Sequence, residues 1–498
     1  MSGMRRLEWP LHIVRRVVIG VVVVAVLAVA VPLGVRWIGD VRARCDDGVV
    51  KRGEDKECVG VTDGSFHFAD HLATVVKKIK EENDLVSKEA KKEPYVSVAY
   101  MTSFTLTNDD SNSEDSVRHE LEGAYLAQYR HNRGDLASSP KIRLLIANTG
   151  SSSAHWNHTV DELIARKDSD DNLVAVTGLG PSTGPNLEAL RKLSESGLAT
   201  VASTMTATNI QGIPGFVRVS PTNVDEAYAA AAYLKRSTKL RTAVVVQDAA
   251  RTNLYADTLG TAFTEAFPDK KTGHRLVAER MTFDSSVPGG AWKNELRYFP
   301  AQLCDTRPQV IYFAGRGRHL TNFLDSLANR SCTDHTFTVL AGDDTSNLDR
   351  EQIAHAVEND VTVLFTGLAH RDMWRADPGR VSERSARYFQ ENGQLDKWFP
   401  GDDRYDGQDL MAHDAVLTAA EGVRMAAGGP GAVTGGAVGR MFQQMNGPQQ
   451  VAGASGFISF RNNGNPRNKA VPILSLNARG RAELVEVSSA QGKPPEGQ

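Results

Sequence analysis

The chain has 498 residues, a formal net charge of −3 at pH 7 and a hydrophobic content of 41%. A near-neutral charge gives no electrostatic case for nucleic-acid binding, and the hydrophobic content supports a full-sized core. A chain of this length is expected to form two domains of ordinary size once its N-terminal segment and tails are set aside.

An almost uninterrupted apolar stretch at 17–35 is the first feature along the chain, and four arginines precede it. A helix of this length, rising about 1.5 Å per residue, spans a bilayer, and flanking basic residues stay cytoplasmic. Arginine and tryptophan follow the stretch, which favours an uncleaved anchor over a cleaved signal peptide. The sequence therefore predicts a cytoplasmic basic segment at 1–16, a transmembrane helix at 17–35, and a single-pass cell-membrane protein whose bulk is extracellular.

The chain contains four cysteines, Cys45, Cys58, Cys304 and Cys332. An even number in an extracytoplasmic chain predicts two disulfides, and the local pairs are Cys45 with Cys58 and Cys304 with Cys332. Four unpaired thiols are the alternative. A zinc site is disfavoured because the chain has no Cys-x-x-Cys pair.

Residues 36–92 are predicted to form an extracytoplasmic stalk, which is charged and turn-rich at first and then helical over 66–91. From Pro94 onward, strand and helix patterns alternate. The first series has strands at 95–100, 142–147, 174–176 and 198–202, with helices at 117–129, 159–165 and after the 178–184 loop. This alternation predicts a parallel sheet covered by helices on both faces.

A second series repeats the pattern without repeating the sequence. Its predicted strands are 243–246, 276–283, 310–313, 337–340 and 361–366. Its predicted helices are 223–234, 255–267, 292–303, 319–328 and 412–427. Two short strands at 457–460 and 470–476 end the fold, and a polar tail at 488–498 is predicted to be disordered.

The β-α-β unit at 174–208 carries small polar residues at the carboxyl ends of both strands. Ser182 and Thr183 follow the first strand, and Ser203, Thr204 and Thr206 follow the second. Ligands bind at these strand ends in open α/β sheets. Because the loops offer hydroxyl and N–H groups but no strong base or metal ligand, the unit predicts a binding site without a catalytic group or cofactor.

The stretch from about Pro94 to Val487 resembles the type I periplasmic-binding-protein family, and most closely its leucine/isoleucine/valine-binding branch of bacterial solute-binding proteins. The order of the matching segments carries the resemblance, since no single motif is specific. These segments are Gly178–Thr208, Ser220–Asn223, Val244–Asp248 with Tyr255, Val310–Gly315, Gly453–Phe460 and Val471–Leu474.

The resemblance implies a two-lobed α/β fold, in which two parallel-sheet lobes are joined by three hinge strands and close on a ligand. The expected boundaries are lobe 1 at 93–219, lobe 2 at 220–344, a return to lobe 1 at 345–446, a return to lobe 2 with a closing hairpin at 447–487, and the tail at 488–498.

The resemblance also implies a site for an amino-acid-like ligand. In this family one lobe holds the ligand carboxylate with hydroxyl and N–H groups, which points by position to Ser182, Thr183, Ser203, Thr204 and Thr206. The other lobe supplies an aromatic contact and an acid for the ammonium, for which Tyr255 and Asp343 are the counterparts. Asp343 also fits a helix cap. Arg316 stands where the family usually has an aromatic residue, and it fits either an anionic ligand or a contact with the other lobe.

Two functions follow as hypotheses. The first is a membrane-anchored solute-binding protein that delivers a small polar solute, amino-acid-like or anionic, to an ABC permease. The second is a ligand-sensing or interaction ectodomain that works with a signalling membrane protein. A homodimer is left open, and nucleic acid is not an expected partner.

Enzymatic functions are disfavoured by the sequence. The glycines at 178–184 resemble a dinucleotide loop only faintly, because a proline interrupts them and no acid ends the next strand. His155 and His158 have no third metal ligand nearby, and the chain has no Gly-x-Ser-x-Gly elbow.

Overall fold

The computed structural model describes residues 15–16, 18–22, 43–107, 110–347, 350–375, 377–401, 403–429, 432–494 and 496. The expected cytoplasmic segment at 1–16 and membrane span at 17–35 lie largely outside these residues. Among the helices that are described, none combines the length and the apolar character needed to cross a bilayer.

The first lobe is built on an eight-stranded sheet in the order β1-β2-β3-β5-β4-β6-β7-β8. The strands are β1 (Arg44–Asp46), β2 (Val49–Arg52), β3 (Glu57–Thr62), β4 (Tyr95–Thr102), β5 (Lys141–Asn148), β6 (Leu173–Gly178), β7 (Ala199–Ala202) and β8 (Phe216–Arg218). The five strands from β5 to β8 in this order are parallel. The order reverses at β4, so the crevice between β4 and β6 is the position where such sheets bind ligands.

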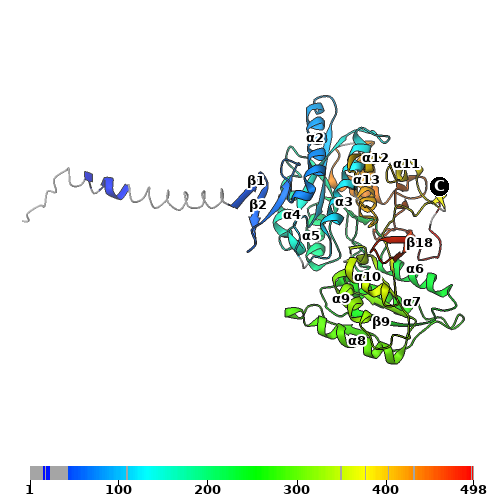
Figure 1. The fold of residues 1–498 in the computed structure, drawn as a ribbon. Helices are drawn as coiled ribbons and strands as arrows, with labels where there is room; N and C mark the ends of the chain where they lie inside the picture. The colour runs from blue at the N-terminus through cyan, green and yellow to red at the C-terminus, as the bar shows by residue number, and fades with distance from the viewer. Residues whose placement is uncertain are drawn as a thin grey trace, which may run out of the picture.

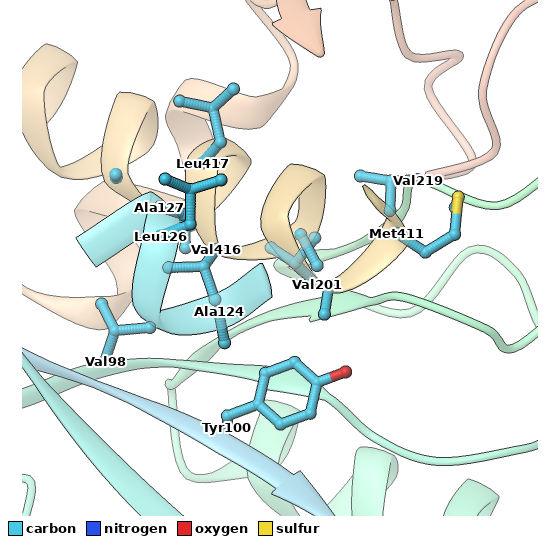
Figure 2. Packing of buried hydrophobic residues seen from close by; sticks show 14 of the residues in the cluster. Val98, Tyr100, Ala124, Leu126, Ala127, Val201, Val219, Met411, Val416 and Leu417 are labelled. Atoms are coloured by element: carbon cyan, nitrogen blue, oxygen red, sulfur yellow. The ribbon is translucent and has the colours of Figure 1, made fainter. Parts of the chain in front are cut away.

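Helices cover both faces of this sheet. They are α2 (Ala73–Glu89), α3 (Glu114–Asn132), α4 (Trp156–Ala165), α5 (Gly184–Glu195), α13 (Gln408–Ala427) and α14 (Gly435–Phe442). Val98 and Tyr100 of β4 pack against α3 and α13 on one face, as Figure 2 shows. Their neighbours Ala99 and Met101 pack against the other face, since successive strand residues point in opposite directions.

The second lobe has a sheet in the order β10-β9-β12-β13-β14-β17-β18, and β11 also pairs with β9. The strands are β9 (Thr242–Asp248), β10 (Arg275–Leu276), β11 (Met281–Phe283), β12 (Val310–Ala314), β13 (Phe337–Ala341), β14 (Val361–Thr366), β17 (Val471–Leu476) and β18 (Ala482–Ser488). Helices α6 (Asn223–Lys235) and α7 (Leu254–Ala266) cover one face. Helices α8 (Trp292–Thr306), α9 (Gly317–Ala328) and α10 (Arg350–Glu358) cover the other.

Three chain crossings join the two lobes, which lie one above the other in Figure 1. They run from β8 to α6, from β14 to α13, and from β16 to β17. The remaining elements are α11 (Glu383–Ala386), α12 (Gln394–Trp398), β15 (Val451–Gly453) and β16 (Gly456–Ile458). The two-lobed α/β fold expected from the sequence is confirmed.

Two of the expected boundaries differ from the structure. Lobe 2 does not end at residue 344, because β14 pairs with β13 and the crossing follows Thr366. The stretch 447–487 is divided between the lobes, since β15 packs against α13 of lobe 1 while β17 and β18 extend the sheet of lobe 2.

Residues 43–92 are part of lobe 1, and the expectation of a stalk at 36–92 is wrong for them. Strand β3 pairs antiparallel with β5, and the apolar stripe of α2, including Val76 and Ile79, is buried in the lobe core. Asn83 of α2 completes the junction, because its amide accepts from Leu144 N at 2.9 Å and donates to Leu144 O at 2.8 Å. A stripe of this kind is equally compatible with a spacer helix until its partner surface is known.

Both predicted disulfides are confirmed. Cys45–Cys58 links β1 to β3, and Cys304–Cys332 links α8 to the loop after α9. The tail at 488–498 is predicted to be disordered, but part of it is packed in the structure. Ser489 is fully buried, and Asn468 Nδ2 donates to the Lys493 carbonyl oxygen at 2.8 Å.

Candidate functional site

The carboxyl ends of β6 in lobe 1 and β12 in lobe 2 meet in the structure. Arg316, just after β12, donates from Nη2 to the carbonyl oxygen of Ser182, just after β6, at 2.7 Å. Only 8% of Arg316 and 1% of Ser182 are exposed. A second contact joins the backbone N–H of Thr208 to Thr258 Oγ1 of α7 at 3.4 Å. The two lobes are therefore closed upon each other at the predicted binding loops.

The two Ser/Thr loops of lobe 1 are bonded to each other. Ser182 Oγ accepts from Ala207 N at 2.9 Å, and Ser203 N donates to Gly178 O at 3.1 Å. Gly178 has φ +87°, and a Cβ there would lie 2.7 Å from a backbone oxygen of β4. The first loop therefore requires glycine at this turn. Thr183 Oγ1 accepts from Asn186 N at 3.4 Å and so acts as the N-cap of α5.

A buried hydroxyl–carboxyl chain lies behind these loops. Tyr100 Oη, near the end of β4, donates to Glu120 Oε2 of α3 at 2.8 Å and lies 3.2 Å from Ser203 Oγ. At most 1% of each of these three residues is exposed. Burial raises the pKa of Glu120 to about 7, and the hydrogen bond from Tyr100 opposes this rise.

Lobe 2 contributes a pair of acids, of which Glu226 is fully buried and Asp343 is half-buried. Glu226 Oε2, in the first turn of α6, accepts from Asp343 N at 3.2 Å and from Thr366 Oγ1 at 2.7 Å. Burial is the largest cause that raises the pKa of both carboxyls. The charge of Asp343 raises the pKa of Glu226 further, and the charge of Asp344 raises the pKa of Asp343. Tyr312 of β12 lies beside them, and its hydroxyl has no hydrogen-bond partner among the described residues.

Arg316 lies between these acids and lobe 1. Its guanidinium carbon is 4.9 Å from the centre of the Tyr255 ring, and Nη1 is 3.9 Å from Asp344 Oδ2. Tyr255 Oη accepts from Asp344 N at 3.4 Å, and a Cβ on Gly342 would come within 2.1 Å of that hydroxyl oxygen. The absence of a side chain at 342 therefore lets Tyr255 reach the cleft.

The structure brings four of the eight residues proposed from the sequence into direct proximity, namely Ser182, Tyr255, Arg316 and Asp343. Ser203 and Thr206 are buried in the same pair of loops, and Thr204 is half-buried beside them. Their roles toward a ligand stay predictions. The start of the helix predicted near residue 348 lies outside the described residues. Asp344 Oδ2 accepts from Gly317 N at 2.9 Å at the start of α9.

Sequence reasoning missed several residues of this site, among them Tyr100, Glu120 and Glu226. Tyr100 is the recoverable case, because it lies close to the carboxyl end of a predicted strand. Glu226 was expected only as a favourable acid in the first turn of a helix, and Glu120 lies in the middle of one. Nothing local in the sequence distinguishes these two carboxyls from solvated ones.

The described residues contain no group of three His, Cys, Asp or Glu side chains placed to hold a metal ion. His413 bonds Asp414 at 2.8 Å, and both residues are fully buried. Asp414 in turn accepts from Ala454 N at 2.7 Å, so this pair fastens the β15–β16 hairpin to α13.

Comparison with solved structures identifies the class of fold. The leucine-binding protein LivK of Thermotoga maritima matches with a TM-score of 0.58 at 18% identity, over 79% of this chain and 98% of that one. The branched-chain amino-acid substrate-binding protein LivJ of Streptococcus pneumoniae, in complex with isoleucine, matches with a TM-score of 0.58 at 15% identity, over 79% and 99%.

A solute-binding protein of Rhodopseudomonas palustris in complex with benzoate has a TM-score of 0.55 at 14% identity, over 81% of this chain and 98% of that one. No family model and no curated protein sequence matches the chain. These likenesses confirm that the chain has the fold of type I periplasmic-binding proteins.

Proposed function

We propose that the protein is an extracytoplasmic solute-binding protein whose two lobes close on a small polar solute with a cationic group. The pair of acids Glu226 and Asp343 carries this proposal. Two carboxyls in contact inside a cleft are costly to ionise unless a positive charge joins them. The ammonium group of an amino-acid-like solute supplies that charge, while the hydroxyl and N–H groups of lobe 1 suit its carboxylate.

Delivery of the solute to an ABC-type permease is part of this proposal. It is supported by the fold shared with LivK and LivJ, which are named as leucine- and branched-chain-amino-acid-binding proteins. An N-terminal membrane anchor at 17–35 is proposed from the sequence alone, as is an extracellular position for the lobes.

A second function is favoured by one observation, the hydrogen bond from Arg316 to Ser182. The guanidinium group of Arg316 joins the two lobes at the place where a bound ligand would otherwise join them. This arrangement suits a sensing or interaction ectodomain that retains the fold without transport.

Thermal unfolding of the full-length protein against amino acids, small peptides, amides and organic anions tests the proposal. A solute that binds only the folded cleft raises stability by about 2.7 kcal/mol at a hundred times its dissociation constant. Ser182→Ala is expected to weaken binding by roughly 1–3 kcal/mol through loss of a polar partner. Glu279→Gln, on the exposed surface of lobe 2, should leave binding unchanged.

The acid pair also predicts how affinity changes with pH. Because the pKa of Asp343 is raised to about 7, the pair holds a proton at low pH, and it must lose that proton to solvent before it can bind a cationic solute. Affinity should therefore fall as pH is lowered from about 8 to 6, and Asp343→Asn should flatten this dependence. A ligand whose affinity is independent of pH in both proteins would show that the pair does not bind its cation.

A further inference from the structure

Arg218 is a buried cation at the end of β8, directly before the first crossing between the lobes. None of its surface is exposed, and its Nε and Nη2 donate to no atom of the described residues. Burial lowers the pKa of Arg218 to about 9, and the charge of Asp225 opposes this shift. Asp225 itself bonds Thr222, whose N and Oγ1 lie 3.3 and 2.9 Å from its Oδ2. Burying a cation that no acid bonds costs free energy, so stability alone does not explain Arg218.

One nitrogen of Arg218 holds the second Ser/Thr loop of lobe 1, residues 203–208. Nη1 donates to the carbonyl oxygen of Met205 at 2.5 Å and to that of Ala207 at 3.0 Å. Ser220 Oγ supports the first of these bonds, since it donates to the Met205 carbonyl oxygen at 3.2 Å. Two carbonyl groups that lie two residues apart thus turn toward one nitrogen, which fixes the orientation of the loop between them.

The bonds to Arg218 also decide where the N–H groups of the loop point, because a trans peptide group directs its N–H away from its C=O. The carbonyl of Ala207 faces Arg218, so the N–H of Thr208 faces away and donates across the cleft to α7 at 3.4 Å. The carbonyl of Met205 turns the N–H of Thr206 toward the cleft in the same way. This N–H donates to no atom of the described residues, although only 1% of Thr206 is exposed. Buried N–H groups without an acceptor are rare, so this donor is available to a solute.

We propose that Arg218 is a positioning residue of the solute site, which holds the second Ser/Thr loop with the Thr206 N–H facing the cleft and thereby favours a solute that carries a carboxylate. This role rests on the solute-binding function proposed above. The loop lies between the guanidinium group and the solute, so Arg218 acts through the loop and not by contact. Its charge is poorly screened in the protein interior and adds to the attraction that the N–H exerts on a carboxylate oxygen.

Equilibrium binding to the full-length protein tests this role with two pairs of probes, leucine with leucinamide and benzoate with benzamide. The members of a pair differ in the exchange of a carboxylate for a neutral amide. In a pair that binds, the carboxylate is expected to bind at least about tenfold more tightly than its amide. Arg218→Met keeps much of the side-chain length but removes the charge and both hydrogen bonds, so it should lower this preference about tenfold. Arg218→Gln keeps an N–H donor without the charge, and it should lower the preference as well.

Arg330 of lobe 2 provides a matched control. It is also buried, and it also donates to backbone carbonyl groups, those of Leu327, His335 and Asn359, at 3.2, 2.9 and 2.7 Å. These groups belong to the segments around α9 and α10 and not to the Ser/Thr loops. Arg330→Met should therefore leave the preference for the carboxylate unchanged, whatever it does to stability. A loss of preference that is confined to the Arg218 variants separates positioning of the loop from a general effect of removing a buried arginine.

Amide hydrogen exchange in the solute-free protein tests the same role without a ligand. Release of the two carbonyl groups in Arg218→Met should speed exchange of the Ala207 and Thr208 N–H groups about tenfold, because the bonds that these groups make depend on the orientation of the loop. Arg330→Met should leave exchange in this loop unchanged. Arg218→Gln gives the same comparison if Arg218→Met does not fold.

The two measurements keep the proposals apart. If neither pair of probes binds but the loop exchanges faster in the Arg218 variants, the positioning role is supported and the solute-binding function is not. If a pair binds and its preference is the same in the Arg218 variants as in the unmodified protein, the positioning role is overturned while the solute-binding function stands. Unchanged exchange of the loop in both Arg218 variants also overturns the positioning role.

Discussion

Glu120 lies in the middle of α3 with 1% of its surface exposed, and its pKa is raised to about 7 chiefly by burial. An unfolded glutamate titrates near 4.5. The folded state therefore binds more protons between these two values, and the stabilisation present below pH 4.5 is lost as pH rises through 7. The shift corresponds to roughly 3 kcal/mol, since one pKa unit is worth about 1.4 kcal/mol.

Glu120→Gln should remove this share of the pH dependence. The amide keeps an oxygen for the Tyr100 hydroxyl but carries no charge at any pH. Chemical unfolding at pH 5 and pH 8 is expected to show a smaller loss of stability in the variant, with Glu188→Gln on the exposed surface as the control. Equal losses in the variant and the unmodified protein would show that Glu120 is ionised at little cost in the fold.

Sequence reasoning found the polar loops of the cleft and Asp343, but it did not find Glu226 or Glu120. Ser182 and Ser203 follow strands whose apolar character is plain, so the carboxyl-end rule reaches them. Glu226 and Glu120 lie on helices, where an acid is normally solvated, and only the packing of another element against them removes that water. Their burial depends on tertiary contacts, which a local sequence pattern does not contain.

Helix α2 is the element whose role differs most from expectation. Asn83 uses its whole amide in the junction with lobe 1. Its Nδ2 donates to the carbonyl oxygens of Asp63 and Leu144, while Oδ1 accepts from Leu144 N and from Gln128. Strand β3 pairs with β5 only from Ile146 to Asn148. Asn83 therefore bonds β5 on a part of its edge that β3 does not cover. The helix is thus fastened to the sheet by polar pairing as well as by its apolar stripe.

Asn83→Ala should cost about 2–4 kcal/mol of unfolding free energy, since it removes the side-chain partner of the buried N–H and C=O groups of Leu144 and one of the two acceptors of the Gln128 amide. Lys77→Ala, at an exposed position of the same helix, should change stability by less than about 0.5 kcal/mol. Urea unfolding of both variants measures the difference. If the two variants are equally stable, α2 behaves as part of the stalk that the sequence predicts, and not as part of the lobe core.

At the scale of the whole molecule, the alternating strands and helices predicted the helix-covered parallel sheets, and the resemblance to a known family predicted the two lobes. The number and local spacing of the cysteines predicted the two disulfides. The crossings between lobes were harder to place. The apolar sequence of β14 fits a buried strand of either lobe. Only its pairing with β13 assigns it to lobe 2. Similarly, nothing in the composition of 43–62 shows that these strands extend the sheet of lobe 1 through β3.

The lobes are expected to open and close about these crossings, with Arg316 and the solute competing to join them. Distances between spin labels at Glu195→Cys in lobe 1 and Lys271→Cys in lobe 2 report this motion, since all four native cysteines are in disulfides. The most direct measurement is the distribution of this distance in the full-length protein, in its Arg316→Ala variant, and in that variant with the solute found by thermal unfolding. The account predicts a short distance in the first, longer distances in the variant, and a return to the short distance with solute. One unchanged distribution under all three conditions would contradict closure of the cleft on a solute.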